Sequence, residues 1–134
     1  MISGQSVSNG TTAFSSTNYW SSLTTYPAYV YDSNSILYNY VENYKTYLES
    51  KGAAVEEARL IKVEELDALG CSSSSYSCSG APSWVYSTTY WPGEAWGYNQ
   101  IWLVVSNGEF GVNDWNAKRE AGVRPVIKLL LSEL

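Results

Sequence analysis

One stretch of this 134-residue chain carries the periodicity of a long amphipathic helix, and this feature limits most strongly the folds open to it. The cluster Asp32-Ser33-Asn34-Ser35 is rich in residues that start helices, and Gly52 suits the position after a helix end. Between them, apolar side chains recur at i, i+4, i+7 and i+11, which places them on one face of about four helical turns. These side chains are Leu37, Val41, Tyr44 and Leu48.

The segments on either side of this helix favour short elements. Residues 1–31 carry no charge and are rich in Ser, Thr, Asn and Tyr, which predicts an irregular arm with one or two short strands, one of them near 26–31. Residues 58–61 predict a short strand. Residues 63–69 predict a second, short helix that ends at Gly70.

The C-terminal third predicts β structure. Asn107-Gly108 is a strong turn signal between two apolar runs, so it predicts a hairpin. The expected strands are 84–91, 101–105, 109–112 and 123–131, with 92–99 and 113–121 as loops. The order of elements predicts an α+β fold, with residues 1–33 as an irregular arm of the domain formed by residues 34–134.

The composition excludes several classes of function. The chain has no His, which removes Ser-His-Asp and Cys-His nucleophile systems and His-based zinc sites. Its formal net charge of −5 argues against binding to nucleic acid. No apolar run is long enough to span a membrane, and the start of the sequence lacks the basic and apolar regions of a signal peptide. We expect the chain to be part of a longer, surface-anchored protein.

Two cysteines, Cys71 and Cys78, lie in a serine-rich loop. Their spacing does not match a CxxC redox motif, and two cysteines without His leave a zinc site short of ligands. A local disulfide is the favoured interpretation, and it implies an oxidising compartment.

Three carboxylates, Glu94, Glu109 and Asp114, lie in or near aromatic segments. They could form the acid and nucleophile of a glycosidase, but solvated surface charge is the favoured interpretation. The strings around Trp91 and Asp114 do not have the order of a lectin calcium loop, and the EF-hand pattern is absent. We therefore expect no metal and no cofactor.

Aromatic residues crowd the stretch from 91 to 115. Trp102 lies in an apolar run and is expected in the core. Trp96, Tyr98 and Trp115 have Gly and Asn neighbours typical of loops, so they are expected on a binding surface, where aromatic rings offer rigid contact area. The charged pair Lys118 and Arg119 is either a solvated loop or the rim of that surface.

Several short motifs resemble the formylglycine-generating-enzyme superfamily. The segment Ala-Arg-Leu-Ile-Lys-Val-Glu-Glu-Leu at 58–66 resembles its Arg-Leu-Pro-Thr-Glu-Ala-Glu-Trp signature, and Gly-Val-Arg-Pro-Val-Ile at 122–127 resembles its Gly-Phe-Arg ending. The intervening order of Tyr-Trp at 90–91, Trp-Leu-Val at 102–104 and Asn-Gly at 107–108 is also similar. The resemblance covers about residues 34–130 and is greatest to non-catalytic bacterial surface domains.

This resemblance implies a C-type-lectin-like fold, with two helices packed on small twisted antiparallel sheets. It also implies structural roles for Arg59 and Arg124, each of which would hold its strand. Lys62 stands where the superfamily has a helix-capping Thr, so that cap is lost or supplied from elsewhere. The catalytic members need a late cysteine pair or a His-based iron site, and this chain has neither, so we expect no enzymatic activity.

Non-catalytic relatives of this fold include the variable proteins of diversity-generating retroelements, which phages and bacteria use to bind changing targets. The resemblance therefore implies a display domain that binds a protein or glycan on a cell or virion surface, with the ligand face at about 91–120. A carbohydrate-binding module of a secreted or surface protein is the alternative. The candidate ligand-binding residues are Trp91, Glu94, Trp96, Tyr98, Gln100, Asn113, Trp115, Asn116, Lys118 and Arg119.

Overall fold

The computed structural model of this chain describes residues 11–97, 100–111 and 120–130. The described residues form a mixed α+β fold with two α-helices, α1 (Tyr38–Ser50) and α2 (Val63–Ala68), and the 3-10 helix η2 (Ser83–Tyr86). Neither of these α-helices has the length and apolar character needed to cross a lipid bilayer.

Small antiparallel sheets connect segments that are far apart in the sequence. Two of the sheets each pair one early strand with one late strand. The third sheet has three strands, one early in the sequence and two from its later half. In the two-stranded sheets, β1 (Thr12–Ala13) pairs with β6 (Glu120–Ala121) and β3 (Val55–Arg59) pairs with β7 (Val126–Leu129). In the three-stranded sheet, β4 (Glu94–Gly97) lies between β2 (Ala28–Tyr29) and β5 (Gln100–Ile101) and pairs with both.

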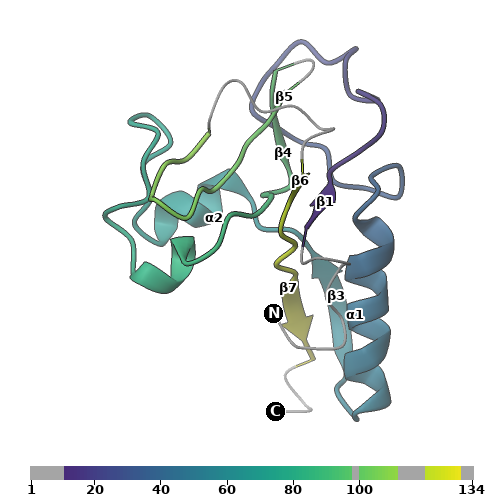
Figure 1. The fold of residues 1–134 in the computed structure, drawn as a ribbon. Coiled ribbons are helices and arrows are strands. Elements are labelled where there is room, and N and C mark those ends of the chain that lie inside the picture. The colour runs from purple at the N-terminus through teal and green to yellow at the C-terminus, as the bar shows by residue number, and fades with distance from the viewer. Residues whose placement is uncertain (1–10, 98–99, 112–119, 131–134) are drawn as a thin grey trace.

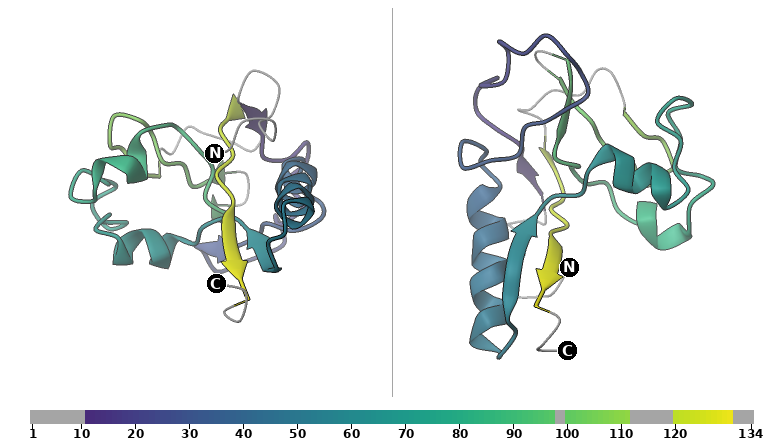
Figure 2. Two further views of the ribbon diagram at one scale, coloured as in Figure 1. Left: turned by 90° about the horizontal axis from the view of Figure 1, so that it is seen from below. Right: turned by 180° about the vertical axis from the view of Figure 1, so that it is seen from behind.

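The elements are arranged as a stem and a side lobe (Figure 1). Helix α1 lies along strand β3, which pairs with β7, and these three elements form the stem. Helix α2, η2 and the loops that follow them form the lobe on the other side of the C-terminal strand, and both further views show the same separation (Figure 2).

The long predicted helix is confirmed, although it begins later than the start cluster. The backbone N–H of Asn34 donates to the Asp32 carboxylate at 2.7 Å, and the Ser35 hydroxyl donates to the Asp32 carbonyl at 2.7 Å. These bonds close turns before the helix, because short polar side chains compete for backbone groups. At the other end Gly52 has φ +96°, a conformation that favours glycine after a helix.

The predicted Asn-Gly hairpin is also confirmed. The backbone N–H of Gly108 donates to the Val105 carbonyl at 2.8 Å, and that of Val105 donates to the Glu109 carbonyl at 2.9 Å. Gly108 adopts φ +96°, which the turn requires. The paired runs are shorter than predicted and consist partly of isolated bridges such as Val104 with Phe110.

Three local predictions are wrong. The predicted strand 84–91 is wrong at its start, where residues 83–86 form η2, because the Pro82 carbonyl accepts the Val85 N–H and starts a helical turn. Residues 94–97, expected in a loop, form the central strand β4, and residues 120–121 form β6 against β1. In both cases a partner distant in the sequence takes part in the pairing, β2 for β4 and β1 for β6, and no local pattern encodes it.

Two hydrophobic clusters fill the interior. The first joins the arm, α1 and the sheets, and its bulkiest buried members are Phe14, Trp20, Leu37, Leu60, Trp91, Ile101 and Leu103. The second fills the lobe and includes Val63, Leu66, Val85, Tyr90, Trp102 and Phe110 together with both cysteines. Trp102 is 4% exposed, as expected of a core residue.

Candidate binding surface

The ten candidate ligand-binding residues divide into two groups. Six of them lie outside the described residues: Tyr98, Asn113, Trp115, Asn116, Lys118 and Arg119. The structure places the other four, Trp91, Glu94, Trp96 and Gln100, and it does not place them together on one surface.

The prediction that Trp91 belongs to a ligand face is wrong. Its side chain is fully buried in the first hydrophobic cluster, edge-on to Phe14 with ring centroids 5.9 Å apart. The indole N–H donates to the Thr12 carbonyl at 2.9 Å, while the backbone N–H of Trp91 donates to the Gly122 carbonyl. Trp91 therefore ties the arm to the late part of the chain and is closed to a ligand.

The placement of Glu94 in the ligand face is also wrong. Glu94 is 8% exposed, and its carboxylate accepts a hydrogen bond from the backbone N–H of Val63, the first residue of α2. Burial raises the pKa of this carboxyl above its ordinary value. Glu65 accepts the N–H of Lys62 at 2.9 Å, so two carboxylates supply the cap that Lys62 cannot give.

Trp96 and Gln100 remain partly exposed on β4 and β5. The Trp96 ring contacts the Tyr76 ring, with centroids 5.8 Å apart, and both rings lie about 6 Å from the buried ring of Trp102. Tyr76 is 50% exposed. We call Tyr76, Trp96 and Trp102 the aromatic cluster. Its base is fixed, because Trp102 packs on Phe110 with centroids 4.8 Å apart.

Tyr76 was not predicted at the binding surface, because it lies in a serine-rich run with no hydrophobic period. It sits in the loop closed by the Cys71–Cys78 disulfide, which confirms the predicted pairing. Its backbone has φ +55°, and its carbonyl accepts the Phe110 N–H at 3.1 Å. The one signal in the sequence that could have indicated Tyr76 is its position as an aromatic residue between two cysteines expected to form a disulfide.

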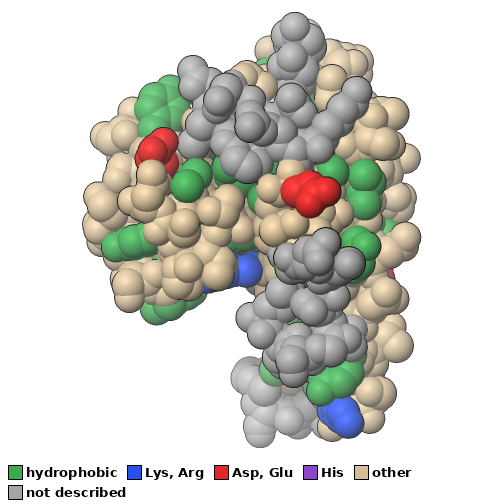
Figure 3. All heavy atoms as spheres, viewed as in Figure 1, with side chains coloured by type: hydrophobic (Ala, Val, Ile, Leu, Met, Phe, Trp, Pro, Cys, Tyr) green, Lys and Arg blue, Asp and Glu red, His purple; other side chains and the backbone are tan. Residues whose placement is uncertain are grey.

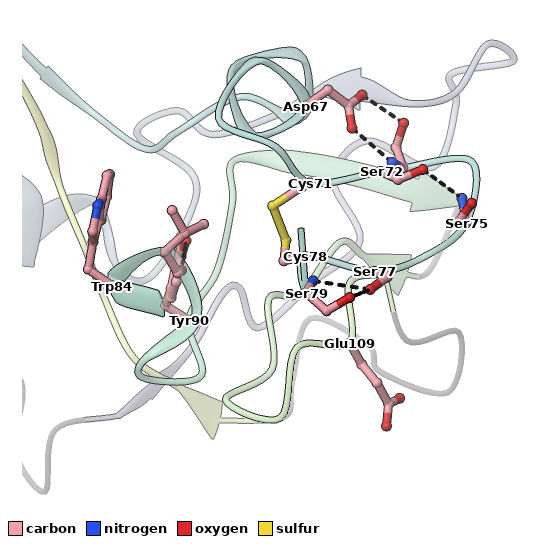
Figure 4. Close-up of a disulfide and its surroundings, with 12 residues drawn as sticks. Asp67, Cys71, Ser72, Ser75, Ser77, Cys78, Ser79, Trp84, Tyr90 and Glu109 are labelled. Carbon is pink, nitrogen blue, oxygen red and sulfur yellow. Dashed lines mark hydrogen bonds between the residues drawn. A yellow bond between two sulfur atoms is a disulfide. The ribbon is translucent and has the colours of Figure 1, made fainter. Parts of the chain in front are cut away.

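Hydrogen bonds hold this loop on the lobe (Figure 4). Both Asp67 carboxylate oxygens bind Ser73 at 2.8 Å, one through its backbone N–H and one through its hydroxyl. The Cys78 N–H donates to the Gly108 carbonyl at 2.7 Å, which joins the loop to the hairpin. The loop that carries Tyr76 is therefore anchored at both ends and along its length.

The carboxylates considered for glycosidase chemistry have local contacts. Glu109 accepts a hydrogen bond from the Asn107 side chain at 2.8 Å within the hairpin, and Glu94 caps α2. Asp114 lies outside the described residues. Among the residues that the structure describes, no group of three or more Cys, Asp or Glu is placed to hold a metal ion.

The two arginines of the resemblance make different contacts. Arg59 forms a fork with Glu65, in which both N···O distances are 2.8 Å, and these hydrogen bonds lower the pKa of Glu65 to about 2. Arg124 donates to the Trp84 carbonyl at 2.6 Å and to the Ser87 hydroxyl at 2.5 Å, and it lies over the Tyr90 ring at 4.5 Å. The first arginine is paired with a carboxylate, whereas the second, within the part of the chain that the structure describes, contacts neutral groups.

Comparison of this chain with family models, with curated proteins and with solved structures finds no match in any of the three.

Proposed function

We propose that this chain is a non-enzymatic ligand-binding display domain, and that its binding surface is built around the aromatic cluster of Tyr76, Trp96 and Trp102. The observation that carries the proposal is the half-exposed Tyr76 ring, packed against Trp96 and supported by the buried Trp102. Rings held in this way lose little conformational entropy on binding, so they give contact area at low cost.

The surface extends along the chain on both sides of the cluster. Gln100 is partly exposed one strand away from Trp96, and Tyr98 lies between them in the sequence. Asn113, Trp115, Asn116, Lys118 and Arg119 belong to the same proposed surface on the strength of the sequence alone. Because Trp91 and Glu94 are buried, they are excluded from the proposed ligand face. The face therefore keeps eight of the ten residues predicted from the sequence and gains Tyr76.

We propose a C-type-lectin-like arrangement as the frame. The support is topological: β1 near the start of the chain pairs with β6 near its end, and β3 pairs with β7. Such pairing closes the chain on itself, so that the intervening loops project from a fixed base. The order of helix, strand, short helix, disulfide loop and hairpin also agrees with that frame.

An oxidising location is part of the proposal. The disulfide is consistent with a domain displayed outside the cell or on a virion, and the expected target is a protein or glycan there. A carbohydrate-binding module is the second candidate. It is favoured by the stacking of Tyr76 on Trp102 at an interplanar angle of 26°, which turns the exposed Tyr76 ring into a supported platform for a sugar ring.

The test is a binding screen with matched variants. Fluorescently labelled protein is applied to a printed glycan array and to whole bacterial cells, with and without protease treatment of the cells. Tyr76→Ala and Trp96→Ala are compared with Ile36→Ala, which removes a side chain of similar exposure, 37%, outside the cluster. The proposal predicts saturable binding that falls at least about tenfold in the two cluster variants and is unchanged in Ile36→Ala. Equal binding by all three variants would overturn it.

A further inference from the structure

The cleft between the lobe and the stem contains a second, separate set of ligand-competent groups. Figure 3 shows that the surface is concave where the lobe meets the stem, and that Lys or Arg side-chain atoms lie in this hollow. A cavity of about 360 Å³ is lined there by Tyr44 of α1, by Trp84 and Ser87 at η2, and by Arg124 and Pro125 before β7. A neighbouring cavity of about 510 Å³ shares Ser87 and Arg124 and adds the hydroxyl-bearing residues Thr11, Thr88 and Thr89. Both volumes lie in the range of small-molecule sites.

Arg124 carries a positive charge that no described carboxylate offsets. Arg59 and Lys128 both form ion pairs with glutamates, but the described contacts of Arg124 are two carbonyl oxygens, one hydroxyl and the face of an aromatic ring. A guanidinium has five N–H donors. These contacts use the two terminal nitrogens, and they leave the Nε–H without an acceptor among the residues that the structure describes.

The position of this guanidinium is fixed before any ligand arrives. Its hydrogen bonds to the Trp84 carbonyl and the Ser87 hydroxyl hold it to η2, and the Tyr90 ring supports it from below at 4.5 Å. Tyr90 is itself buried, and its hydroxyl donates to the Val85 carbonyl at 2.6 Å. A prearranged arginine with spare donors binds a carboxylate without the entropic cost of ordering a long side chain.

Trp84 supplies the second recognition element. At 59% exposure it is the most exposed of the large hydrophobic residues among those described, and Trp84 lines the same cavity as Arg124. Figure 4 shows Trp84 farther from the disulfide than Tyr90, which packs in the same hydrophobic cluster as both cysteines. The remaining lining is hydroxyl-rich, and hydroxyls can both donate to and accept from a polyhydroxylated ligand.

We propose that this cleft binds an acidic saccharide. The carboxylate of a uronic acid lies on the Arg124 guanidinium, the sugar ring lies against the Trp84 indole, and the sugar hydroxyls exchange hydrogen bonds with Ser87 and Thr88. This site is independent of the aromatic cluster. It is formed by η2 and the segment before β7, whereas the cluster is formed by the disulfide loop, β4 and the residues after β5.

The experiment is a titration with chemically matched probes. The intact chain is titrated with a tetramer of galacturonic acid, with the same tetramer fully methyl-esterified, with a neutral glucose tetramer, and with the peptide tetra-alanine. Binding is followed by calorimetry and by the NMR signal of the Trp84 indole N–H. The proposal predicts binding of the acid tetramer and at least about tenfold weaker binding of its ester, because the ester keeps the shape and removes the charge.

Variants locate the site. Trp84→Ala removes an exposed ring and keeps the backbone carbonyl that Arg124 binds, so it should fold and lose at least about tenfold in affinity for the acid tetramer. Arg124→Lys keeps the positive charge but loses the paired N–H donors of the guanidinium, and it should weaken binding as well. Tyr76→Ala should leave this binding unchanged, which separates failure of this proposal from failure of the proposed function.

Three results would overturn the proposal. Equal affinity for the acid and its ester would remove the role of Arg124 as a carboxylate site. Undiminished binding by Trp84→Ala would place the ligand elsewhere. Binding of tetra-alanine as tight as that of the acid tetramer would show a site for carboxylates in general, and the saccharide would lose its part in recognition.

Discussion

The Glu94 carboxylate accepts the backbone N–H of Val63, so a side chain from the central strand β4 caps helix α2. Lys62, the residue before the helix, has no oxygen in its side chain to do this. The contact ties the three-stranded sheet to the lobe, and it explains why a carboxylate expected at a ligand face is 8% exposed.

Two replacements of Glu94 should distinguish the effect of its hydrogen bond to α2 from the effect of its negative charge. Glu94→Gln keeps an acceptor oxygen for Val63 and should stay within about 1 kcal/mol of the wild type in free energy of unfolding, whereas Glu94→Ala should lose about 1–2 kcal/mol. Urea unfolding followed by circular dichroism measures both values. A Glu94→Ala variant as stable as the wild type would show that the cap contributes nothing.

The same carboxyl should give a pH dependence. Burial raises the pKa of Glu94 in the folded protein, so the folded state keeps its proton to a higher pH than the unfolded state does. Stability from this group is therefore greatest at low pH and falls as pH rises through the raised pKa. The difference in free energy of unfolding between the wild type and Glu94→Gln should therefore decrease as the pH rises through the raised pKa of Glu94. A difference that increases with pH would contradict a buried Glu94 with a raised pKa.

Glu65 should show the opposite dependence. Its hydrogen bonds with Arg59 lower its pKa to about 2, from an ordinary 4.5, so the unfolded state binds the proton first as pH falls. The stabilisation is present above pH 4.5 and is lost progressively as pH falls toward 2. The advantage of the wild type over Glu65→Gln in thermal unfolding should shrink across that interval. An advantage that stays constant would argue against the fork in solution.

The disulfide should stabilise the lobe. Its loss in a Cys71→Ser, Cys78→Ser double variant should lower the free energy of unfolding by about 2–3 kcal/mol, the value expected for closing so short a loop. Urea unfolding of the oxidised wild type, the reduced wild type and the double variant measures the effect. The reduced wild type should match the double variant, and a double variant as stable as the oxidised protein would show that the bond is dispensable.

Gly111 should tolerate no side chain. Its φ is +79°, and a Cβ there would lie 2.4 Å from the Trp102 ring, so Gly111→Ala must displace the base of the aromatic cluster. We expect a loss of about 2–4 kcal/mol from strain and overpacking together. Gly52→Ala is the matched control, because Gly52 has φ +96° but nothing within 4 Å of its Cβ position, and it should lose only about 1 kcal/mol. Equal losses in thermal unfolding would contradict the close approach of Trp102.

The sequence predicted elements whose signals are local. The amphipathic period marked α1, Gly52 and Gly70 marked helix ends, and Asn107-Gly108 marked the hairpin turn. It failed where distant partners decide the structure. Strand β4 pairs with the distant strand β2 as well as with the neighbouring β5, and Trp91 is buried because the arm folds over it.

The candidate site was harder to predict than the fold for the same reason. Periodicity cannot show whether an aromatic side chain near a loop points outward, and Trp91 and Trp96 differ in exposure although both lie near Gly93. Tyr76 joined the surface only through the disulfide and the hairpin that position its loop. The pairing of the two cysteines was predictable, whereas the side chains it brings together were not.

Photo-crosslinking at the aromatic cluster tests the central claim most directly. Tyr76 is replaced by the photoreactive residue benzoylphenylalanine, Ile36 is replaced in the same way as a control, and each protein is irradiated on the glycan or cell surface that the wild type binds. The expected result is a covalent adduct with the target from position 76 and none from position 36. An adduct from position 36 alone, or equal adducts from both positions, would contradict a ligand face built on Tyr76.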